Sequence, residues 1–564
     1  MACATTRSML GLLTLSLVVG ACAGPGAPRV TEIASVPALA QAPDDSAVIP
    51  PPAKAPDSAE VTPPEPPSPA PPEPAAPPIA PKWEYSPLGL SLKLPDGMAA
   101  DLSLAPAYVR LSAPDLDVKV SRERSPYADM EMYFAEYLNR FVSSPEYRSA
   151  NKIHDYQEQW TDVGGRRTRI VSFGRVPSPG SPERQNQYLF AYVMTGGPEF
   201  YTFFFRTSSL VNQRAVIDSI LASFDPIPVK GEAAIEVDFR PELPVWNAET
   251  AALYERLRNA GQVQWGIFYP WAVTQDYSRI AAMEASLGYK FPFILHYLYL
   301  GHEFPTEGMQ RAYARGQVVE LTMQVATFNN DSVPRRNLNF DVLDGVKDSE
   351  IRAFARSAKA FGHPFLFRLN NEMNTDWSQY SGLLTLSDPD IYIKVWRRIY
   401  RIFAEEGVDN AIWIFNPHDR SYPPTHWNDQ IAYYPGNGYV HMLGLTGYNN
   451  GEYFREVTGE RWRSFNEIYE PMVAEYRPLY GKFPWIITEF ASSSVGGDKA
   501  GWIREMFEEM PRYPEIKVAV WWSYADYDYR PGNESIAGRR YWLDEQPEYL
   551  EEFKKGLERQ GALQ

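Results

Sequence analysis

Eight short apolar runs, separated by stretches of helical spacing, constrain the fold of this chain more than any other feature of its sequence. Stretches such as 348–361, 391–406 and 500–510 have helical periodicity and fill the gaps between the runs. Strands that are apolar throughout and alternate with helices are typical of parallel sheets buried on both faces. The runs begin near Gln264, Phe291, Val318, Pro364, Asn410, Val440, Pro484 and Lys517.

Eight such strands over roughly 300 residues is the number that a (β/α)8 barrel requires. A doubly wound open sheet could also use eight strands, but the sequence has no Gly-rich phosphate loop after the first one. We therefore predict an α/β chain in which residues 245–560 form a (β/α)8 TIM barrel.

The first 22 residues have the pattern of a bacterial export signal. Arg7 supplies the positive charge, Met9 to Val19 the short apolar segment, and Val19-Gly20-Ala21-Cys22 the processing site. The tetrapeptide resembles the lipobox of bacterial lipoproteins, which implies lipidation at Cys22. An ordinary secretory peptide with a chance cysteine is the alternative. We expect an extracytoplasmic protein anchored by lipid, at the outer membrane if the cell has two membranes, because Ala23 is not a retention aspartate.

Residues 23–82 form a proline-rich linker that cannot build a packed core, because 19 of these 60 residues are proline and none is aromatic. Such a segment extends as a semi-rigid tether. Cys3 leaves with the signal, so Cys22 is the one cysteine left and no internal disulfide is expected. The formal net charge of -16 argues against a nucleic-acid partner.

Residues 83–230 have the pattern of a small α/β domain. Two β-rich runs, 188–192 and 200–205, flank the hairpin signal Thr195-Gly196-Gly197-Pro198, and 130–142 and 211–224 have helical spacing. With "LSLKLPDGM" near its start and "VIDSILASFDP" at its end, the segment resembles a PsbP-like domain. No constellation of reactive side chains is visible there. We expect a spacer or docking module, with a protein partner as one option.

Polar and aromatic residues stand where the predicted barrel strands end, which is where such barrels build their active sites. Two of them are glutamates three strands apart, and paired carboxyl groups beside aromatic rings are what glycosidic bond cleavage needs. The fourth strand ends with Arg368, Asn370, Asn371, Glu372 and Asn374, the fifth with Asn416 and His418, the sixth with Tyr448, the seventh with Glu489 and the eighth with Trp521 and Trp522.

Taken together, these motifs resemble clan A glycoside hydrolases, and among them glycoside hydrolase family 26, a family of β-mannanases and related endo-β-glycanases. Arg368, the run Asn371-Glu372-Met373-Asn374 and Trp377 correspond to the family pattern on the fourth strand. The segments "VWRRIYRIF", "NAIWIFNP", "YYPGNGYVHMLGLTGYN" and "PWIITEF" follow in the family order. The resemblance covers about the last 310 residues.

The resemblance implies a retaining endo-β-glycosidase in which Glu372 is the general acid/base and Glu489 the nucleophile. Retention requires carboxyl groups about 5–5.5 Å apart. The resemblance further implies substrate contacts by Tyr448 and Trp522, and Arg368 is a candidate to keep a carboxylate charged. Predicted substrate-binding residues are Arg368, Asn371, Trp377, Asn416, Tyr448 and Trp522.

One position departs from the family pattern, because the family has histidine where this chain has Asn371. In most other clan A families an asparagine here bonds the sugar 2-hydroxyl, and mannose differs from glucose at that carbon. The departure leaves catalysis in place and leaves the polysaccharide open between a β-mannan and a related β-glycan.

Several other residues have two interpretations. Tyr269, Trp271 and Tyr299 follow strands and are either sugar platforms or structural, and Asp526 and Asp528 are either subsite contacts or, as we favour, solvated loop carboxylates. Trp396, Trp413 and Trp485 lie within elements and are expected in the core. No histidine spacing predicts a metal site, so neither a metal nor another cofactor is expected.

Two further functions fit the sequence. The chain could be a non-catalytic carbohydrate-binding or exopolysaccharide-accessory lipoprotein, or an envelope scaffold acting through residues 83–230. Within the enzyme class, a transglycosylase would use the same glycosyl-enzyme and pass the sugar to a hydroxyl acceptor.

Overall fold

The structure, a computed structural model, describes residues 82–127, 130–137, 141–327 and 336–563. The predicted signal, Cys22 and the proline-rich segment up to residue 81 lie outside the described residues. From Trp83 onward the described chain belongs to one compact unit. None of the described helices is both long and apolar enough to span a bilayer.

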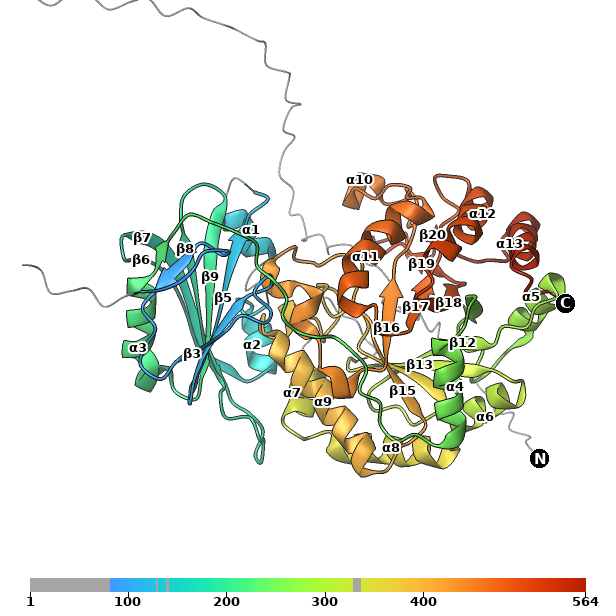
Figure 1. The fold of residues 1–564 in the computed structure, drawn as a ribbon, viewed down its shortest axis with the longest axis horizontal. Helices are drawn as coiled ribbons and strands as arrows, with labels where there is room; N and C mark the ends of the chain where they lie inside the picture. Colours follow the sequence, from blue (N-terminus) through green and yellow to red (C-terminus); the bar gives the residue numbers. More distant parts are fainter. Residues whose placement is uncertain (1–81, 128–129, 138–140, 328–335, 564) are drawn as a thin grey trace, which may run out of the picture. The chain divides into compact units, whose positions relative to one another are not determined.

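Eight parallel strands close into a barrel, which confirms the predicted (β/α)8 architecture and excludes the open sheet (Figure 1). Each strand pairs with the next along the chain, and the last pairs with the first. The strands are β11 (Gln264–Phe268), β12 (Phe293–Tyr299), β13 (Val318–Gln324), β14 (Phe365–Leu369), β15 (Ala411–Phe415), β16 (Met442–Thr446), β17 (Trp485–Phe490) and β18 (Ile516–Trp522).

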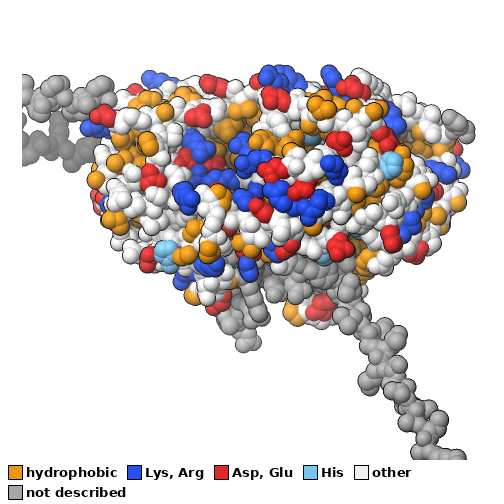
Figure 2. Space-filling model, turned by 90° about the horizontal axis from the view of Figure 1, so that it is seen from below, with side chains coloured by type: hydrophobic (Ala, Val, Ile, Leu, Met, Phe, Trp, Pro, Cys, Tyr) orange, Lys and Arg blue, Asp and Glu red, His pale blue; other side chains and the backbone are white. Residues whose placement is uncertain are grey.

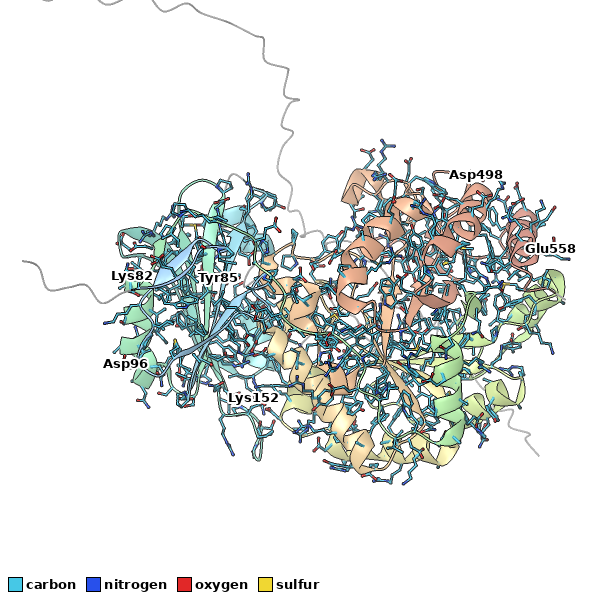
Figure 3. All side chains as sticks on the ribbon, in the orientation of Figure 1. Lys82, Tyr85, Asp96, Lys152, Asp498 and Glu558 are labelled. Atoms are coloured by element: carbon cyan, nitrogen blue, oxygen red, sulfur yellow. The ribbon has the colours of Figure 1, made fainter. Side chains whose placement is uncertain are left out.

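Helices cover the outside of the barrel because each strand is apolar on both faces and needs a second layer. Side chains fill the space between the two layers (Figure 3), and Trp396, Trp413 and Trp485 are buried there as predicted. The helices are α4 (Ala248–Arg258), α5 (Ser278–Leu287), α6 (Thr306–Ala314), α7 (Leu338–Leu343), α8 (Asp348–Phe361), α9 (Pro389–Glu405), α10 (Arg455–Thr458), α11 (Phe465–Tyr480), α12 (Lys499–Glu509) and α13 (Pro547–Arg559).

The connection from β15 to β16 differs from the others. Three short 3-10 helices, His426–Asn428, Gln430–Tyr433 and Asn437–Tyr439, replace an α-helix there. Proline removes a backbone donor and glycine disfavours helix interiors, so Pro423, Pro424 and the Pro435-Gly436 pair explain the interruption.

The N-terminal part contains a seven-stranded antiparallel sheet of order β3-β4-β5-β9-β8-β7-β6 and a small sheet of order β1-β2-β10. The predicted hairpin is the β8–β9 pair. Strand bounds are β1 (Trp83–Tyr85), β2 (Leu90–Leu92), β3 (Ala99–Asp101), β4 (Val109–Ala113), β5 (Leu116–Arg124), β6 (Ile153–Val163), β7 (Arg166–Arg175), β8 (Gln187–Met194), β9 (Glu199–Thr207) and β10 (Asp225–Pro226).

Three helices accompany these sheets, α1 (Met130–Tyr137), α2 (Pro145–Ala150) and α3 (Leu210–Ser223). The described part of α1 is shorter than the predicted 130–142, because residues 141–143 form a turn. The central strands β5, β8 and β9 of the large sheet are buried on both faces. Phe203 and Phe205 share a cluster with Ile217 and Ile220 of α3, whereas Phe204 belongs to the cluster that includes the barrel. The likeness to PsbP remains a prediction.

Charged side chains of both signs are scattered among hydrophobic and other side chains on the face that Figure 2 shows, the side on which α8 lies in Figure 1. Lys and Arg gather near the centre of this face, with acidic side chains among them. Ion pairs link α8 to α9 and its C-terminal end, Asp348 with Arg398 and Arg352 with Glu405 and Glu406. Exposed pairs of this kind contribute little to stability.

Candidate active site

Both predicted catalytic glutamates lie buried at the carboxyl end of the barrel strands. Glu489 is the fifth residue of β17, and Glu372 is the third residue after β14. Each side chain belongs to a residue with only 1% of its surface exposed. Arg368 of β14 is fully buried beside them. The barrel thus brings together residues that are more than 100 positions apart in the sequence.

Glu489 accepts hydrogen bonds at both carboxylate oxygens. Its Oε1 accepts from Arg368 at 2.9 Å and from Asn371 Nδ2 at 3.3 Å. Its Oε2 accepts from the hydroxyl of Tyr448 at 3.1 Å and from the hydroxyl of Tyr297. Four donors from β12, β14 and the ends of β14 and β16 therefore hold this carboxylate in one orientation.

Arg368 is the cation at the centre of this network. Besides Glu489, its guanidinium donates to Thr322 Oγ1 at 2.8 Å, to Asn416 Oδ1 at 2.8 Å and to Tyr297 at 3.1 Å. Burial alone would lower the pKa of Arg368, but the charge of Glu489 keeps it well above its usual value. Asn416 is fully buried and also bonds Thr446 and Thr488, so its side chain is held by the barrel itself.

Glu372 lies in a tight turn in which two residues, Asn370 and Glu372 itself, have left-handed backbone conformations. Asn370 and Glu372 have left-handed φ angles of 52° and 59°, which non-glycine residues adopt rarely. The turn is held at both edges, because the Asn370 amide donates to Met323 at 2.9 Å and the Glu372 amide donates to Asn416 at 2.8 Å. The carboxyl group is thereby aimed at the end of the barrel rather than along the strand.

The environment of the Glu372 carboxyl group favours its protonated form. Burial raises its pKa well above the usual value, and the charge of Glu489 raises it further. Oε2 accepts a bond from the Trp377 indole at 3.3 Å, whereas Oε1 accepts none from the described residues and lies 3.9 Å from Nε2 of His418. Oε1 is therefore a buried oxygen without a hydrogen-bond partner among the described residues.

A third carboxyl group, that of Glu320 on β13, shares the same cation. Its Oε1 lies 3.1 Å from Arg368 Nε, yet neither oxygen accepts a hydrogen bond from the described residues. Burial raises the pKa of Glu320 to about 8, with Arg368 opposing and Glu489 adding to the shift. One guanidinium therefore balances one carboxylate, that of Glu489, while Glu320 and Glu372 hold protons near neutral pH.

A small pocket lies beside Trp377, whose indole bonds Glu372. Its lining includes Trp377 and the predicted platform residue Tyr299, together with Gln324 and Tyr380. The last two bond Asn371, because Gln324 Nε2 and the Tyr380 hydroxyl donate to Asn371 Oδ1 at 3.0 and 2.9 Å. Asn371 is thus fixed between this pocket and Glu489.

Trp522 lies at the end of β18 among other aromatic rings. Its ring stacks on Phe268 at 5.2 Å between centroids and meets Tyr448 edge-on at 6.2 Å. Its indole N–H has no hydrogen-bond partner among the described residues. Trp522 is fully buried in this structure, so the ring forms part of the wall behind Glu489.

The interpretation of Asp526 and Asp528 as solvated carboxylates is wrong. Asp526 pairs with buried Arg539 at 3.0 Å, and burial raises its pKa to about 7 against the opposing charge of Arg539. Asp528 is 2% exposed, and its bond from Arg530 lowers its pKa to about 2. Asp526 lies on a short strand that pairs with the strand of Arg539, and Asp528 accepts from Arg530 two residues further on. A sequence without contacts does not reveal these pairs.

The other two platform candidates are placed outside the groups that bond Glu489 and Glu372. Tyr269 accepts a bond from Arg279 at 3.0 Å and lies under its guanidinium. Trp271 is half-buried with φ of 61°, and its carbonyl accepts three backbone bonds in the turn after β11. These contacts support a structural role for both.

Sequence reasoning placed His418 at the end of the fifth strand but did not single out Tyr297, Glu320, Asp419 or Arg463. Arg463 bonds Asp419 at 3.0 Å, and Asp419 lies 3.1 Å from His418. Burial lowers the pKa of His418, so the imidazole beside Glu372 is neutral near pH 7. Period-2 alternation was the available signal, because Tyr297 and Glu320 face inward from their strands. No group of three or more His, Cys, Asp or Glu in the described chain is arranged to hold a metal ion.

Comparison with known proteins finds a family model that matches part of the barrel. Residues 331–493 match the model of Glycosyl hydrolase family 26. The matched range contains Glu372 and Glu489.

Two curated relatives show what the chain is similar to. It is 30% identical over 211 residues to Endoglucanase H of Acetivibrio thermocellus, covering 35% of this chain and 22% of that protein. It is 31% identical over 98 residues to a Mannan endo-1,4-beta-mannosidase of Bacillus subtilis, covering 16% and 25%. The chain thus spans 22–25% of the length of these relatives.

Solved structures similar to this chain include two mannanases. The catalytic domain of a Bacillus sp. JAMB-750 endo-beta-1,4-mannanase is 16% identical with a TM-score of 0.42, covering 57% of this chain and 92% of that one. A Bacillus subtilis mannanase is 17% identical with a TM-score of 0.36, covering 51% and 89%.

Proposed function

We propose that the barrel is a retaining endo-β-glycosidase that hydrolyses a β-linked polysaccharide. The observation that carries this proposal is the unequal state of its two central glutamates. Four donors hold the Glu489 carboxylate, whereas burial and the charge of Glu489 raise the pKa of Glu372 well above its usual value. A carboxylate beside a carboxylic acid is the pair that double displacement requires.

In the first half of this mechanism, Glu489 attacks the anomeric carbon while Glu372 donates its proton to the departing glycosidic oxygen. The C–O bond to the leaving sugar breaks, and a covalent glycosyl-enzyme forms. In the second half, Glu372 takes a proton from water, whose oxygen attacks the anomeric carbon and releases Glu489. The unpaired Oε1 of Glu372 is free to make the contact with that oxygen.

The polymer is a β-mannan or a related β-glycan in this proposal. The curated relatives are named as an endoglucanase and as mannan endo-1,4-beta-mannosidases. Asn371 is positioned beside Glu489 by Gln324 and Tyr380, where its amide would donate to the sugar 2-hydroxyl. Trp377, which lines the pocket, would provide an apolar face on which a sugar ring stacks, and Tyr448 and Trp522 would form part of the wall of the sugar-binding site. The proposed mechanism uses no metal or cofactor.

Release of reducing ends from a panel of polymers tests the proposal. Residues 83–564 are incubated with β-mannan, β-xylan, mixed-linkage β-glucan and bacterial exopolysaccharides, and we expect cleavage of one of them. Glu372→Ala and Glu489→Ala should each abolish it. Glu515→Gln is the matched control, because Glu515 also pairs with an arginine, Arg477, but precedes β18 at the opposite end of the barrel.

Azide rescue with an aryl glycoside separates the two roles. In Glu372→Ala, azide should intercept the glycosyl-enzyme and give the β-glycosyl azide, whereas in Glu489→Ala it should replace the nucleophile and give the α anomer. Elongated products from wild-type enzyme would identify a transglycosylase. Tight binding to one polymer without any cleavage would instead favour the carbohydrate-binding lipoprotein.

We further propose that lipid at Cys22 tethers the protein outside the cytoplasm, with residues 23–82 as the spacer. The lipobox and the proline content support this. Labelling with a fatty-acid analogue should mark the wild-type protein at the membrane, whereas Cys22→Ser should remain unlabelled. Labelling of that variant would contradict the tether.

A further inference from the structure

The loop between β14 and α9, residues 370–388, contains Glu372 and Trp377 and has strained backbone at both ends. Asn370 and Glu372 at its start, and Leu386 and Ser387 at its end, all have φ angles between 52° and 64°. Non-glycine residues remain in this region only when their surroundings hold them there. Backbone hydrogen bonds to Met323 and Asn416 of the barrel hold the start of the loop. Leu386 and Ser387, at its end, need other contacts to stay in this conformation.

The N-terminal sheet holds the end of the loop through Asp388. Lys119 of β5 lies with its ammonium 2.8 Å from one oxygen of Asp388, and Arg206 of β9 donates to the other at 2.5 Å. All three side chains are buried. Asp388 directly follows the strained pair and is also the N-cap of α9, where its side chain accepts from the Asp390 amide.

The same contact includes a second row of charges. Asp390 lies 3.1 Å from Lys119, 2.8 Å from Arg206 and 3.0 Å from Arg110. Asp117 pairs with both arginines at 2.7 Å. Three cations of the N-terminal sheet therefore face three carboxylates, two of which belong to the start of α9, so charges are balanced inside this contact.

The middle of the loop is held by uncharged groups of the N-terminal part. The buried Tyr147 hydroxyl donates to the carbonyl of Leu384 at 2.6 Å. Asn151 Oδ1 accepts from the amide of Asn337 at 2.8 Å, and the side chain of Asn337 donates to the carbonyls of Gln379 and Leu384 at 2.7 and 2.8 Å.

A neighbouring loop is bound in the same way. The carboxyl of Glu123, on β5, accepts from the amides of His426 and Trp427 at 2.8 and 3.3 Å. The adjoining Asn428 donates through Nδ2 to the carbonyl of Asn374, two residues from Glu372, at 3.0 Å. Two loops that surround Glu372 are thus both fixed by β5.

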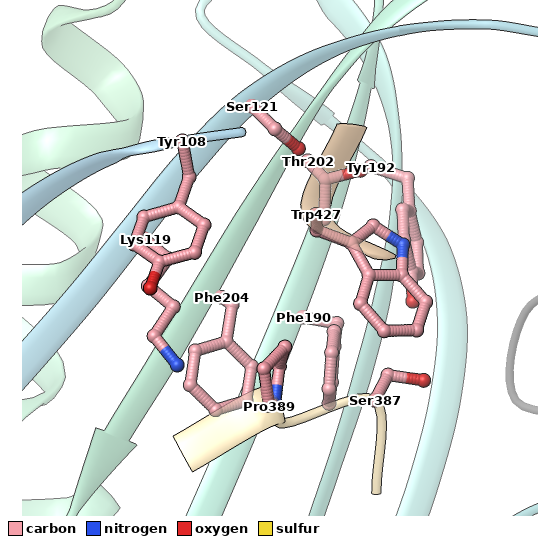
Figure 4. A pocket seen from close by; sticks show the side chains of 10 residues that line it. All are labelled: Tyr108, Lys119, Ser121, Phe190, Tyr192, Thr202, Phe204, Ser387, Pro389 and Trp427. Carbon is pink, nitrogen blue, oxygen red and sulfur yellow. The ribbon is translucent and has the colours of Figure 1, made fainter. Parts of the chain in front are cut away.

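A small cavity lies in this contact, and Figure 4 shows the side chains that line it. Tyr108, Lys119 and Phe204 of the N-terminal part face Ser387 and Pro389 there. The lining is mostly aromatic, so the contact is packed around its charges rather than open to solvent. A packed contact of this kind transmits position, because close-packed interiors deform little.

We infer that the N-terminal domain is a positioning element for the active site: Lys119, Arg206 and Tyr147 fix the β14–α9 loop in the conformation that orients Glu372 and Trp377. None of these three residues bonds Glu489 or Glu372, so they are positioning residues rather than catalytic ones. The catalytic part of the inference rests on the proposed hydrolase. The mechanical part, that these residues order the loop, does not.

Two variants of the full chain test the inference at different strengths. Tyr147→Phe removes one hydroxyl from the loop and leaves its ring in place, whereas Lys119→Met removes a buried charge. Tyr201→Phe and Arg122→Met are matched controls in the same domain. Tyr201 donates to the Leu88 and Gly89 carbonyls, and Arg122, on the same strand as Lys119, pairs with Glu199.

Hydrogen exchange of loop peptides is measured together with kcat and KM on the polymer that wild-type protein cleaves. We expect exchange in residues 376–388 to rise roughly tenfold in Tyr147→Phe, and more in Lys119→Met, while β15 stays protected. Because misplacement by about 1 Å can cost on the order of 100-fold, kcat should fall by about tenfold or more with KM changed less. Lys119→Arg, which keeps the positive charge, should restore part of the loop protection and part of kcat relative to Lys119→Met.

The outcomes are distinguishable. If loop exchange and kcat in Tyr147→Phe and Lys119→Met match their controls, the inference is overturned. If Lys119→Met also raises hydrogen exchange in β15, its effect is a general loss of stability, and the inference is then tested by the loop exchange and kcat of Tyr147→Phe. If wild-type protein cleaves no polymer, the proposed hydrolase fails, and the exchange data still show whether the domain orders the loop.

Discussion

The barrel mouth and the contact between the N-terminal sheet and α9 both bury several charged groups, but they balance them differently. At the mouth, one cation, Arg368, faces three carboxyl groups, and two of those have raised pKa values. At the sheet contact, three cations face three carboxylates, and Lys119 and Arg206 hold the pKa values of Asp388 and Asp390 down although burial opposes this. At the sheet contact, equal numbers of cations and carboxylates hold the two parts of the chain together. At the barrel mouth, there are fewer cations than carboxyl groups, so two of the carboxyl groups keep protons that can be transferred.

The largest effect should come from removing the charge at the mouth. Glu489→Gln should lower kcat by about four orders of magnitude or more, because the nucleophile is lost. Thermal unfolding should change little, since Gln fills the same space and Glu320 can give up its proton to balance Arg368. A fall in melting temperature as large as the fall in activity would instead make Glu489 a structural residue.

Breaking the balanced contact should instead cost stability. Arg206→Met leaves Asp388 and Asp390 with one cation fewer, and removal of one partner from a buried pair costs about 3–5 kcal/mol. Urea unfolding at pH 7 measures this loss. Arg214→Met, which removes an exposed pair with Asp218 in the same domain, should cost less than about 1 kcal/mol.

The two regions should respond to pH in opposite directions. The folded pKa of Glu320 lies above its unfolded value, so its stabilising effect is complete below about pH 4.3 and is lost as the pH rises to about 8, by up to about 1.4 kcal/mol per unit. The folded pKa of Asp390 lies below its unfolded value, so its contribution is present above about pH 4 and is lost on acidification.

The two pH dependences can be separated by measuring the free energy of unfolding of two variants from acid pH to about pH 8. Glu320→Gln should reduce the fall in unfolding free energy between pH 5 and 8 and leave the fall below pH 4 unchanged. Asp390→Asn should reduce only the fall in unfolding free energy below pH 4. Identical curves for the two variants would show that the charges of the mouth and of the contact are not arranged as described.

The smallest effects concern the alkaline limb of activity, which should follow the deprotonation of Glu372. The groups that face Glu372 are Glu489, Arg368, Trp377, His418 and Asp419. Asp419→Asn removes a charge that raises the pKa of Glu372, so the limb should move to lower pH. Trp377→Phe removes a bond that lowers this pKa, so the limb should move up. Profiles of kcat/KM against pH, with Asp498→Asn as control, test both shifts.

Much of the barrel was predictable because each strand is a continuous apolar run, and the two glutamates were predictable because they follow such runs inside recognisable motifs. Tyr297 and Glu320 were harder to identify, since a polar residue within a mainly apolar run such as "FILHYLY" or "VVELTMQ" is easily taken as part of a core strand. Whether it faces inward depends on register and closure, which appear only when all eight strands are in place.

The contact at Asp388 was beyond sequence reasoning for a different reason. Lys119 and its partner Asp388 are 269 positions apart. The alternation of Asp117, Lys119, Ser121 and Glu123 along β5 did mark a polar face, but such a face usually points to water. That this one is buried against the barrel follows from tertiary packing alone.

The chain order of the two halves of this contact has a consequence for assembly in time. A polypeptide is synthesised from its N-terminus, and early domains generally fold first. Lys119 and Arg206 precede Asp388 by 269 and 182 positions, so the sheet that holds them can be complete before α9 is made. The N-terminal sheet can therefore be folded before the barrel is complete, and the loop that contains Glu372 can then fold in contact with it.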